Sequence, residues 1–295
     1  MIQAITMQNL TNGTVVEFDG RNFVLNSHDL DGVTLQHATT KTTHQIGASV
    51  TATNVQSRTI TLIGYTQATS SVSLDANKQK LINLTAPFTD ILITVTTNIN
   101  VYQIVVKADG QPVQWATKYT LNNAMFCKFS LDFFAPTTLW QSPETTVLAF
   151  GGFQNNFSFP FSIPASGIAF GFPLSYSALN INNPYATTGL IFTFQPASTI
   201  TNITITNTVT NQQMVLNTTV NQGQTLTINT NFGSKSITLT DGTTTTNLLG
   251  ALNLVKSTWL QLEVGENTFS LDCGTGAVTD LNGTISYNQK YWGIA

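Results

Sequence analysis

The chain has 295 residues, of which 41% are hydrophobic and only 8% are charged, whereas an ordinary soluble domain carries about 25% charged residues. Its formal net charge of -3 provides no general attraction for phosphate, which depends on clustered Lys and Arg, so we expect no sequence-specific nucleic acid as a partner. No window approaches the roughly 18 apolar residues of a membrane span, and the N-terminus lacks a signal-peptide pattern, so we expect synthesis in a bacterial cytoplasm and no membrane partner.

Thr, Asn, Ser and Gln take the place of the missing charged residues. Thr suits the exposed face of a strand, because its branched Cβ packs well on a pleated surface. The composition therefore predicts a mainly β protein. The two cysteines, Cys127 and Cys273, are far apart and form no CxxC motif, so we expect both to be reduced and partly buried.

Period-2 alternation of apolar and polar residues, the pattern of a half-buried strand, recurs through the first half of the chain. It predicts strands within residues 15–25, 57–66, 90–113 and 124–136. In the second of these segments, one face carries Ile60, Leu62 and Gly64, and the other carries Thr59, Thr61, Ile63 and Tyr65. The Asp-Gly dipeptides at 19–20 and 109–110 are predicted to form hairpin turns, because Gly accepts a positive φ.

One helix is predicted within residues 71–87, where Ser73 is the candidate N-cap and Asp75 lies in the first turn, a position that favours an acid. The apolar face of this helix is expected to be Leu74, Leu81 and Ile82. Pro87 is expected to end the helix. We interpret the segment as an amphipathic helix that closes one side of a sheet.

The sequence changes character between about residues 136 and 160, where Pro, Gly and Phe replace regular alternation. Such a shift is typical of a domain boundary, so we expect two domains that meet near residue 140, one formed by residues 1–140 and the other by residues 141–295. Short strands at roughly 8 to 12 residue spacing follow the boundary, which is the pattern of a β-sandwich.

One hairpin of this second domain is predicted within residues 201–220. Ile203 and Ile205 point to one face, and Met214 and Leu216 return along the partner strand. The outward face of the hairpin carries no charged side chain, which weakens the usual protection of a strand against pairing with another chain. We therefore expect neutral, Thr-rich strand surfaces to pack against copies of the same chain.

Catalytic and metal-binding patterns are weak. The histidines His28, His37 and His44 lie near Asp29 and Asp31, but their spacing matches no metal-site motif, and we interpret the segment as a polar loop. The carboxylates that a glycosidase would need in a pair could be drawn only from Glu144, Glu263, Glu266, Asp272 and Asp280. The sequence pairs none of them and contains no nucleophile or phosphate-loop motif, so we predict no enzyme and no cofactor.

Exposed aromatic residues could serve a sugar site, because a pyranose ring stacks on Trp or Tyr. Trp259 is the candidate for sugar stacking, with Trp140, Tyr176 and Tyr185 as further aromatic residues to consider. Single aromatics in sandwiches more often pack in the core or at an edge. A carbohydrate-binding module that recognises host cell-wall saccharide through the second domain is the alternative function.

The order of segment 29–66, the predicted helix and the strand at 125–136 resembles the N-terminal domain of the distal tail protein (Dit) family of long-tailed (siphovirus) phages of Gram-positive bacteria. The segments "FPFSIPASG" (159–167) and "STWLQLEVGENTF" (257–269) resemble the galectin-like C-terminal domain of that family. The resemblance implies an N-terminal β-sandwich or sheet domain with one α-helix and a protruding hairpin, then a galectin-like, jelly-roll-type β-sandwich. It also allows the last residues to return to the first domain.

The same resemblance implies a non-enzymatic structural protein of the virion, located at the tail tip. In the family, copies form a hexameric ring that joins the tail tube to the host-adhesion apparatus. The implied partners are further copies of the chain and the tail tube protein, the tail-tip or tail-associated protein and the receptor-binding protein of the same phage. The ring contacts implied by the resemblance fall in segment 29–66, around Arg58, and in the strands of 90–113. The residues expected at these contacts are Arg58, Ile60, Leu62 and Tyr102.

Two departures from the family pattern limit the adhesion role. The run from Phe159 to Phe194 continues through predicted sandwich strands and leaves no room for the inserted arm or carbohydrate module that some relatives carry. No His lies beyond His44, so the galectin-type sugar pattern is missing. We therefore expect host adhesion itself to belong to another protein of the same tail.

Overall fold

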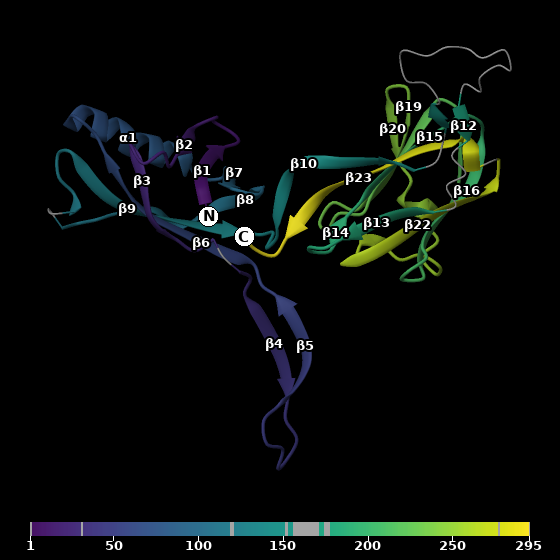
Figure 1. The fold of residues 1–295 in the computed structure, drawn as a ribbon, viewed down its shortest axis with the longest axis horizontal. Coiled ribbons are helices and arrows are strands. Elements are labelled where there is room, and N and C mark those ends of the chain that lie inside the picture. Colours follow the sequence, from purple (N-terminus) through teal and green to yellow (C-terminus); the bar gives the residue numbers. More distant parts are fainter. Residues whose placement is uncertain are drawn as a thin grey trace. The chain divides into compact units, whose positions relative to one another are not determined.

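The computed structural model describes residues 2–30, 32–118, 121–150, 153–155, 171–173, 178–276 and 278–294. The chain forms two compact units (Figure 1). Unit 1 consists of Met1–Pro143 together with Lys290–Ala295, and unit 2 of Glu144–Gln289. Unit 2 is thus an insertion in unit 1, whose last residues come from the far end of the sequence. Both units are built mainly of β-strands, which confirms the predicted fold class.

Unit 1 is built from two groups of antiparallel strands that share one long strand, β8. The first group has the order β2-β1-β7-β8, and the second has the order β3-β6-β9-β8. The elements are β1 (Ile2–Asn9), β2 (Val15–Glu17), β3 (Phe23–His28), β4 (Leu35–Thr40), β5 (Ser49–Val55), β6 (Arg58–Gln67), α1 (Ser71–Leu84), β7 (Ile91–Thr97), β8 (Val101–Trp115) and β9 (Phe126–Ala135). Strands β10 (Trp140–Ala149) and β23 (Leu281–Tyr291) contribute to both units, because the unit boundaries fall within them.

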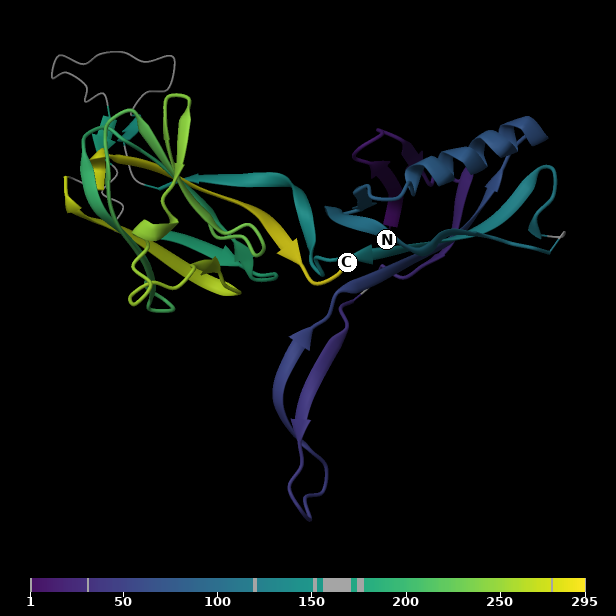
Figure 2. The same ribbon diagram turned by 180° about the vertical axis from the view of Figure 1, so that it is seen from behind.

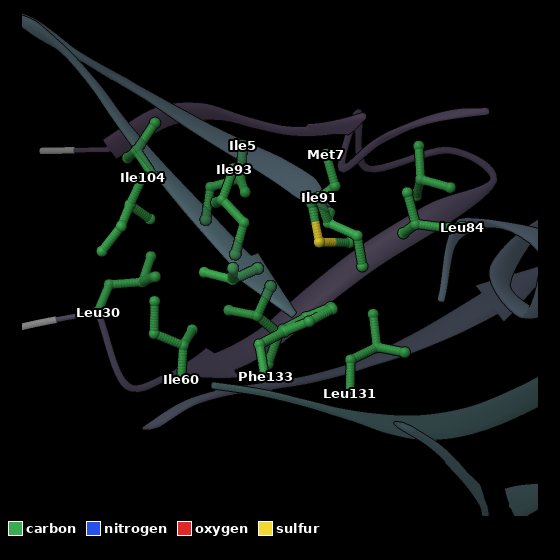
Figure 3. Packing of buried hydrophobic residues seen from close by; sticks show 14 of the residues in the cluster. Ile5, Met7, Leu30, Ile60, Leu84, Ile91, Ile93, Ile104, Leu131 and Phe133 are labelled. Atoms are coloured by element: carbon green, nitrogen blue, oxygen red, sulfur yellow. The ribbon is translucent and has the colours of Figure 1, made fainter. Parts of the chain in front are cut away.

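The core of unit 1 follows from the period-2 pattern. Strands β6, β7 and β9 alternate buried and less buried residues along most of their length, as the sequence predicts for the segments 57–66 and 124–136. Figure 3 shows apolar side chains of β1, β6, β7, β8 and β9 meeting between the strands, with Leu30 and Leu84 at the margin. Leu30 is fully buried, although no strand includes it.

Both predicted Asp-Gly hairpins are wrong. At Asp19-Gly20 the chain does turn, with Gly20 at φ 74°, but β2 pairs with β1 while β3 pairs with β6. The turn therefore passes from one group of strands to the other. At Asp109-Gly110 the chain does not reverse at all; both residues lie inside β8, where its pairing with β9 shifts between Ala108 and Val113. A local turn signal does not specify which strands pair.

The helix α1 begins earlier than predicted. Its N-cap is Ser70, whose hydroxyl accepts a hydrogen bond from the backbone N–H of Ser73, while the Ser73 side chain in return accepts from the Ser70 N–H. This reciprocal capping box satisfies two backbone donors that the helix leaves without partners. Ser73 is therefore the third helical residue instead of the N-cap, and Asp75 lies beyond the first turn.

The buried face of α1 also differs from the prediction. Leu74 and Leu81 are buried as expected, but Leu84 completes the face, and Ile82 is 47% exposed. At about 100° per residue, Ile82 and Leu84 lie on opposite flanks of the line from Leu74 to Leu81. Helical spacing allows either flank, and packing against β1, β2 and β6 buries the Leu84 side. The helix ends at Leu84, before Pro87.

Unit 2 contains two larger antiparallel sheets, with the strand orders β13-β22-β16-β17 and β23-β15-β18-β19-β20. Its apolar core includes the fully buried Phe192, Phe194 and Phe269. Its further elements are β11 (Phe153–Asn155), β12 (Gly171–Pro173), β13 (Leu179–Asn183), β14 (Thr188–Gly189), β15 (Ile191–Pro196), β16 (Ile200–Asn207), β17 (Gln212–Val220), β18 (Gln224–Asn229), β19 (Ser236–Asp241), β20 (Thr244–Asn247), β21 (Gln261–Leu262), β22 (Gly265–Thr275) and the 3-10 helices Leu249–Ala251 and Val278–Asp280. Much of the run from Phe159 to Phe194, expected to hold no insert, lies outside the described residues.

The hairpin predicted within residues 201–220 is confirmed. Ile203 lies opposite Leu216 and Ile205 opposite Met214 in the β16–β17 register, and all four are buried. The outer edge of β16 is not available for pairing with another chain, because β16 is also paired with β22. The outer edge of β17 is covered by the segment 252–258, in which Asn253 and Thr258 donate backbone hydrogen bonds to β17.

Candidate functional site

The four residues expected at ring contacts lie inside unit 1. Ile60 and Leu62 are fully buried, Tyr102 is 2% exposed and Arg58 is 6% exposed. Their side chains fill the core or bind backbone of the same unit, so they offer no surface to another copy. Alternation in β6 correctly marked a buried face, but the face is covered by the chain's own core.

The most exposed regular structure in unit 1 is the β4–β5 hairpin. We call β4, β5 and the loop between them, residues 35–55, the arm. Every residue of both strands is exposed, and the two strands pair with each other and with no other described strand. Both views of the ribbon show the arm extending away from the other strands of unit 1 (Figures 1 and 2). A lone two-stranded ribbon is at best marginally stable in water, so the arm is suited to being covered by a partner.

A β-bulge gives the arm one apolar face. Cross-strand partners share a face of the ribbon, and Leu35 pairs with Val55 at one end while Thr39 pairs with Val50 toward the loop. The register shifts between these pairs, where the Thr51 hydroxyl donates to the Ala38 carbonyl oxygen at 3.0 Å. Without this shift, period-2 alternation would place Val50 and Val55, five residues apart, on opposite faces.

We call this the apolar face of the arm because it carries Leu35, Val50 and Val55, which are 50%, 59% and 41% exposed. Thr39, the partner of Val50, lies on the same face. Between them lies the pair His37 and Thr53, whose side chains form a hydrogen bond of 2.9 Å between His37 Nδ1 and Thr53 Oγ1. The opposite face of the arm carries the pairs Gln36–Asn54, Ala38–Ala52 and Thr40–Ser49. The resemblance implies a protruding hairpin in this domain, and the arm is a hairpin of that kind. Alternation did not mark its two strands or its apolar face, because Thr occurs on both faces and a bulge has no clear sequence signal.

The loop at the end of the arm adds an exposed apolar residue, Ile46, and two residues in the left-handed backbone region, His44 at φ 67° and Gly47 at φ 84°. Of the predicted polar-loop histidines, His37 and His44 belong to the arm and His28 ends β3. Within the described residues, no group of three or more His, Cys, Asp or Glu side chains could hold a metal ion.

The candidate sugar-stacking residue, Trp259, packs partly against the core of unit 2. The ammonium group of Lys235 lies 5.5 Å from the centroid of its ring and 5.3 Å from that of Phe232. This cation–π arrangement occupies ring surface that a pyranose would use. Of the other aromatic candidates, Trp140 is fully buried in unit 1 and Tyr185 is 43% exposed.

The acidic candidates have ordinary polar partners. Glu263 accepts a hydrogen bond from the Thr187 hydroxyl at 2.9 Å, and Asp280 accepts one from the Ser198 hydroxyl at 2.7 Å. Both cysteines are free thiols, with Cys127 buried and Cys273 half-buried. Tyr176 and Asp31 lie outside the described residues. Among the helices that the structure describes, none is long and apolar enough to cross a membrane.

Comparison with known proteins connects this architecture to phage tails. A model of the C-terminal domain of siphovirus-type tail components matches residues 185–291. The crystal structure of the Dit protein of phage SPP1, described as a paradigm of the hub adsorption apparatus in phages that infect Gram-positive bacteria, is similar with a TM-score of 0.68 and 14% identity. That similarity covers 98% of this chain and 100% of the SPP1 chain.

A chain of the phage P2 baseplate in its activated conformation with Ca is similar over the full length of both chains, with a TM-score of 0.55 and 13% identity. None of the curated proteins matches the sequence significantly. At these identities the solved structures establish the fold. Residues 185–291 match the family model of the C-terminal domain of siphovirus-type tail components, and over nearly its whole length the chain has the fold of the SPP1 Dit protein.

Proposed function

We propose that this protein is a non-enzymatic hub of the phage tail tip, in which six copies form a ring that joins the tail tube to the host-adhesion apparatus. The observation that carries the proposal is the arm. It is a bare ribbon with one apolar face, and its fully exposed strands gain stability when a neighbouring subunit covers them.

In the proposed ring, the apolar face of the arm contacts a different surface on the next copy. Such a contact is heterologous, and it forms a closed ring when its rotation divides the full circle. The low charge of the chain, 8%, fits a protein whose surface is largely covered in an assembly. In such a ring each copy makes two arm contacts, one through its own arm and one with the arm of its neighbour. A contact that is weak by itself therefore contributes twice to holding each copy.

The proposed partners follow from the family of unit 2. All but the last two residues of the matched tail-component domain, residues 185–291, fall within this unit. We propose that unit 2 is the attachment point for the tail-associated and receptor-binding proteins of the same phage. Unit 1, which carries the arm, would form the ring on the tail tube protein. The site of action would be the tail tip of the virion.

Native mass spectrometry and negative-stain imaging of the purified protein test the ring. We expect a mass of six chains and annular particles. A variant in which residues 35–55 are replaced by a short Gly-Ser turn should be monomeric while keeping the circular dichroism spectrum of a folded β protein, because the arm contributes nothing to the core of unit 1. A wild-type protein that stays monomeric at high concentration and is missing from virions would overturn the proposal, as would assembly of the armless variant at wild-type concentrations.

A further inference from the structure

We propose that Arg58 and the C-terminal segment 291–294 form a clasp that fixes the base of the arm and so sets the direction in which the arm leaves unit 1. Arg58 is then a positioning residue for assembly instead of a contact residue. The effect of the clasp on assembly rests on the proposed ring; its effect on the arm base does not.

The strand that enters the arm is fixed at its start. Leu30 is fully buried in the core of unit 1, in the same apolar cluster as Ile60 (Figure 3). One residue earlier, the backbone N–H of Asp29 donates to the carbonyl oxygen of Thr61 at 3.0 Å. The chain therefore reaches the arm from a point anchored in the core.

Arg58 binds the backbone directly after this anchor. Its Nη1 donates to the carbonyl oxygen of Leu30 at 3.1 Å, and its Nη2 donates to the carbonyl oxygen of Gly32. Gly32 has φ 57°, the left-handed backbone region that favours glycine. Arg58 therefore holds the two residues that turn the chain from the core into the arm.

The strand that leaves the arm is held from the other side. The carbonyl oxygen of Gln56 accepts a hydrogen bond from the Thr138 hydroxyl at 2.7 Å, and the Gln56 N–H donates to the carbonyl oxygen of Thr34 at 2.9 Å. Two residues later, Arg58 begins β6 and pairs with Ala135 of β9. Both chain passages at the arm base are thus bonded to the body of unit 1.

The third part of the clasp comes from the other end of the sequence. Arg58 Nη2 also donates to the carbonyl oxygen of Trp292 at 3.0 Å, across a separation of 234 residues. Tyr291, just before it, packs edge-on against Tyr102, with ring centroids 4.9 Å apart at 77°. Tyr102, one of the residues expected at a ring contact, therefore holds the C-terminal segment in place.

The C-terminal segment also packs closely on the arm base. A Cβ atom at Gly293 would lie 3.3 Å from the backbone nitrogen of Gly32, tighter than ordinary van der Waals contact. Ile294 packs against the apolar core of unit 1. The segment is therefore anchored on both sides of Trp292, which places the Trp292 carbonyl oxygen against the guanidinium.

This geometry calls for arginine. The guanidinium is planar and presents five N–H donors in fixed directions, so one buried group can bind carbonyl oxygens from three backbone positions; a lysine ammonium is a compact charge on a flexible stem. The guanidinium also lies 5.8 Å from the centroid of the Trp140 ring. Fixing the arm before association lowers the ordering cost that association must otherwise overcome.

Hydrogen exchange followed by mass spectrometry tests the clasp in the full-length protein. We compare wild type with Arg58→Lys and with a chain that ends at Tyr291. Both changes should speed exchange at residues 29–34 and 54–57 by about tenfold, which corresponds to ~1.4 kcal/mol of local stability, and should leave β7 and β8 unchanged. Arg21→Lys, at an exposed arginine of the same unit, is the matched control and should behave as wild type.

Assembly of the same variants provides the second measurement. Both clasp variants keep every residue of the arm, so they should still form rings but need about tenfold more protein to do so. Unchanged exchange at the arm base in both variants overturns the clasp, as does a general rise in exchange throughout unit 1, which would make Arg58 an ordinary core residue. A wild-type protein that forms no ring, combined with faster exchange at the arm base of the variants, contradicts the ring and leaves the clasp standing.

Discussion

The apolar face of the arm gives the sharpest prediction, tested by the double variant Val50→Lys/Val55→Lys. Full burial of a Val or Leu side chain stabilises by about 1.5–3 kcal/mol. Since Leu35, Val50 and Val55 are 50%, 59% and 41% exposed, roughly half of that remains to be gained on contact, or about 1 kcal/mol for each residue. The double variant should therefore lose about 2 kcal/mol per arm contact, equivalent to a roughly 30-fold weaker association.

Sedimentation velocity over a concentration series measures this loss as a shift in the concentration of half-assembly. The matched control is Gln36→Lys/Asn54→Lys, which places two lysines on the opposite face of the same ribbon. Neither variant should change the urea midpoint of unfolding by more than a small amount, because surface substitutions of this kind usually alter stability by no more than about 0.5 kcal/mol. If the control loses assembly and the valine variant keeps it, the face derived from the bulge is wrong.

Three further predictions concern stability and ligand binding. Asn9→Ala should lower the free energy of unfolding by about 2–3 kcal/mol in urea titrations, because the buried Asn9 amide donates to the Leu84 carbonyl oxygen at 2.9 Å; a wild-type midpoint would show that this bond is dispensable. Burial raises the pKa of the Cys127 thiol, so the unfolded chain loses this proton first and stability should fall as pH rises above about 9; Cys127→Ala should flatten that part of the profile, and an unchanged slope would contradict the assignment. Because Lys235 covers the Trp259 ring, we expect no saturable binding in a cell-wall glycan assay, whereas binding abolished by Trp259→Ala would favour the carbohydrate-binding alternative.

The sequence was most informative where structure depends on local alternation. The β6 strand, the β9 strand and the β16–β17 hairpin were predictable because a half-buried strand repeats every two residues. The helix was predictable in existence and less so in detail, since Leu84 and Ile82 flank the line from Leu74 to Leu81 on opposite sides, at about 70° and about 90°. Packing against the neighbouring strands decided between them.

The local sequence did not determine which strands pair or which surface covers a buried face. The dipeptide at 19–20 has the chemistry of a hairpin turn, yet its flanking strands pair elsewhere. Likewise, alternation correctly marked Ile60 and Leu62 as buried, but burial by the chain's own core and burial by another copy leave the same pattern in a sequence.

The sequence by itself determined a mainly β chain of low charge. Thr and other neutral polar residues occupy the strand faces on which charged side chains are common. Tertiary structure alone decided that a bulge beside Thr51 gathers Val50 and Val55 on one face, and that Trp292 returns across 234 residues to Arg58. The physical reason is the range of the interactions. Alternation and capping act between near neighbours, whereas register and buried hydrogen bonds join residues that only the completed fold brings together.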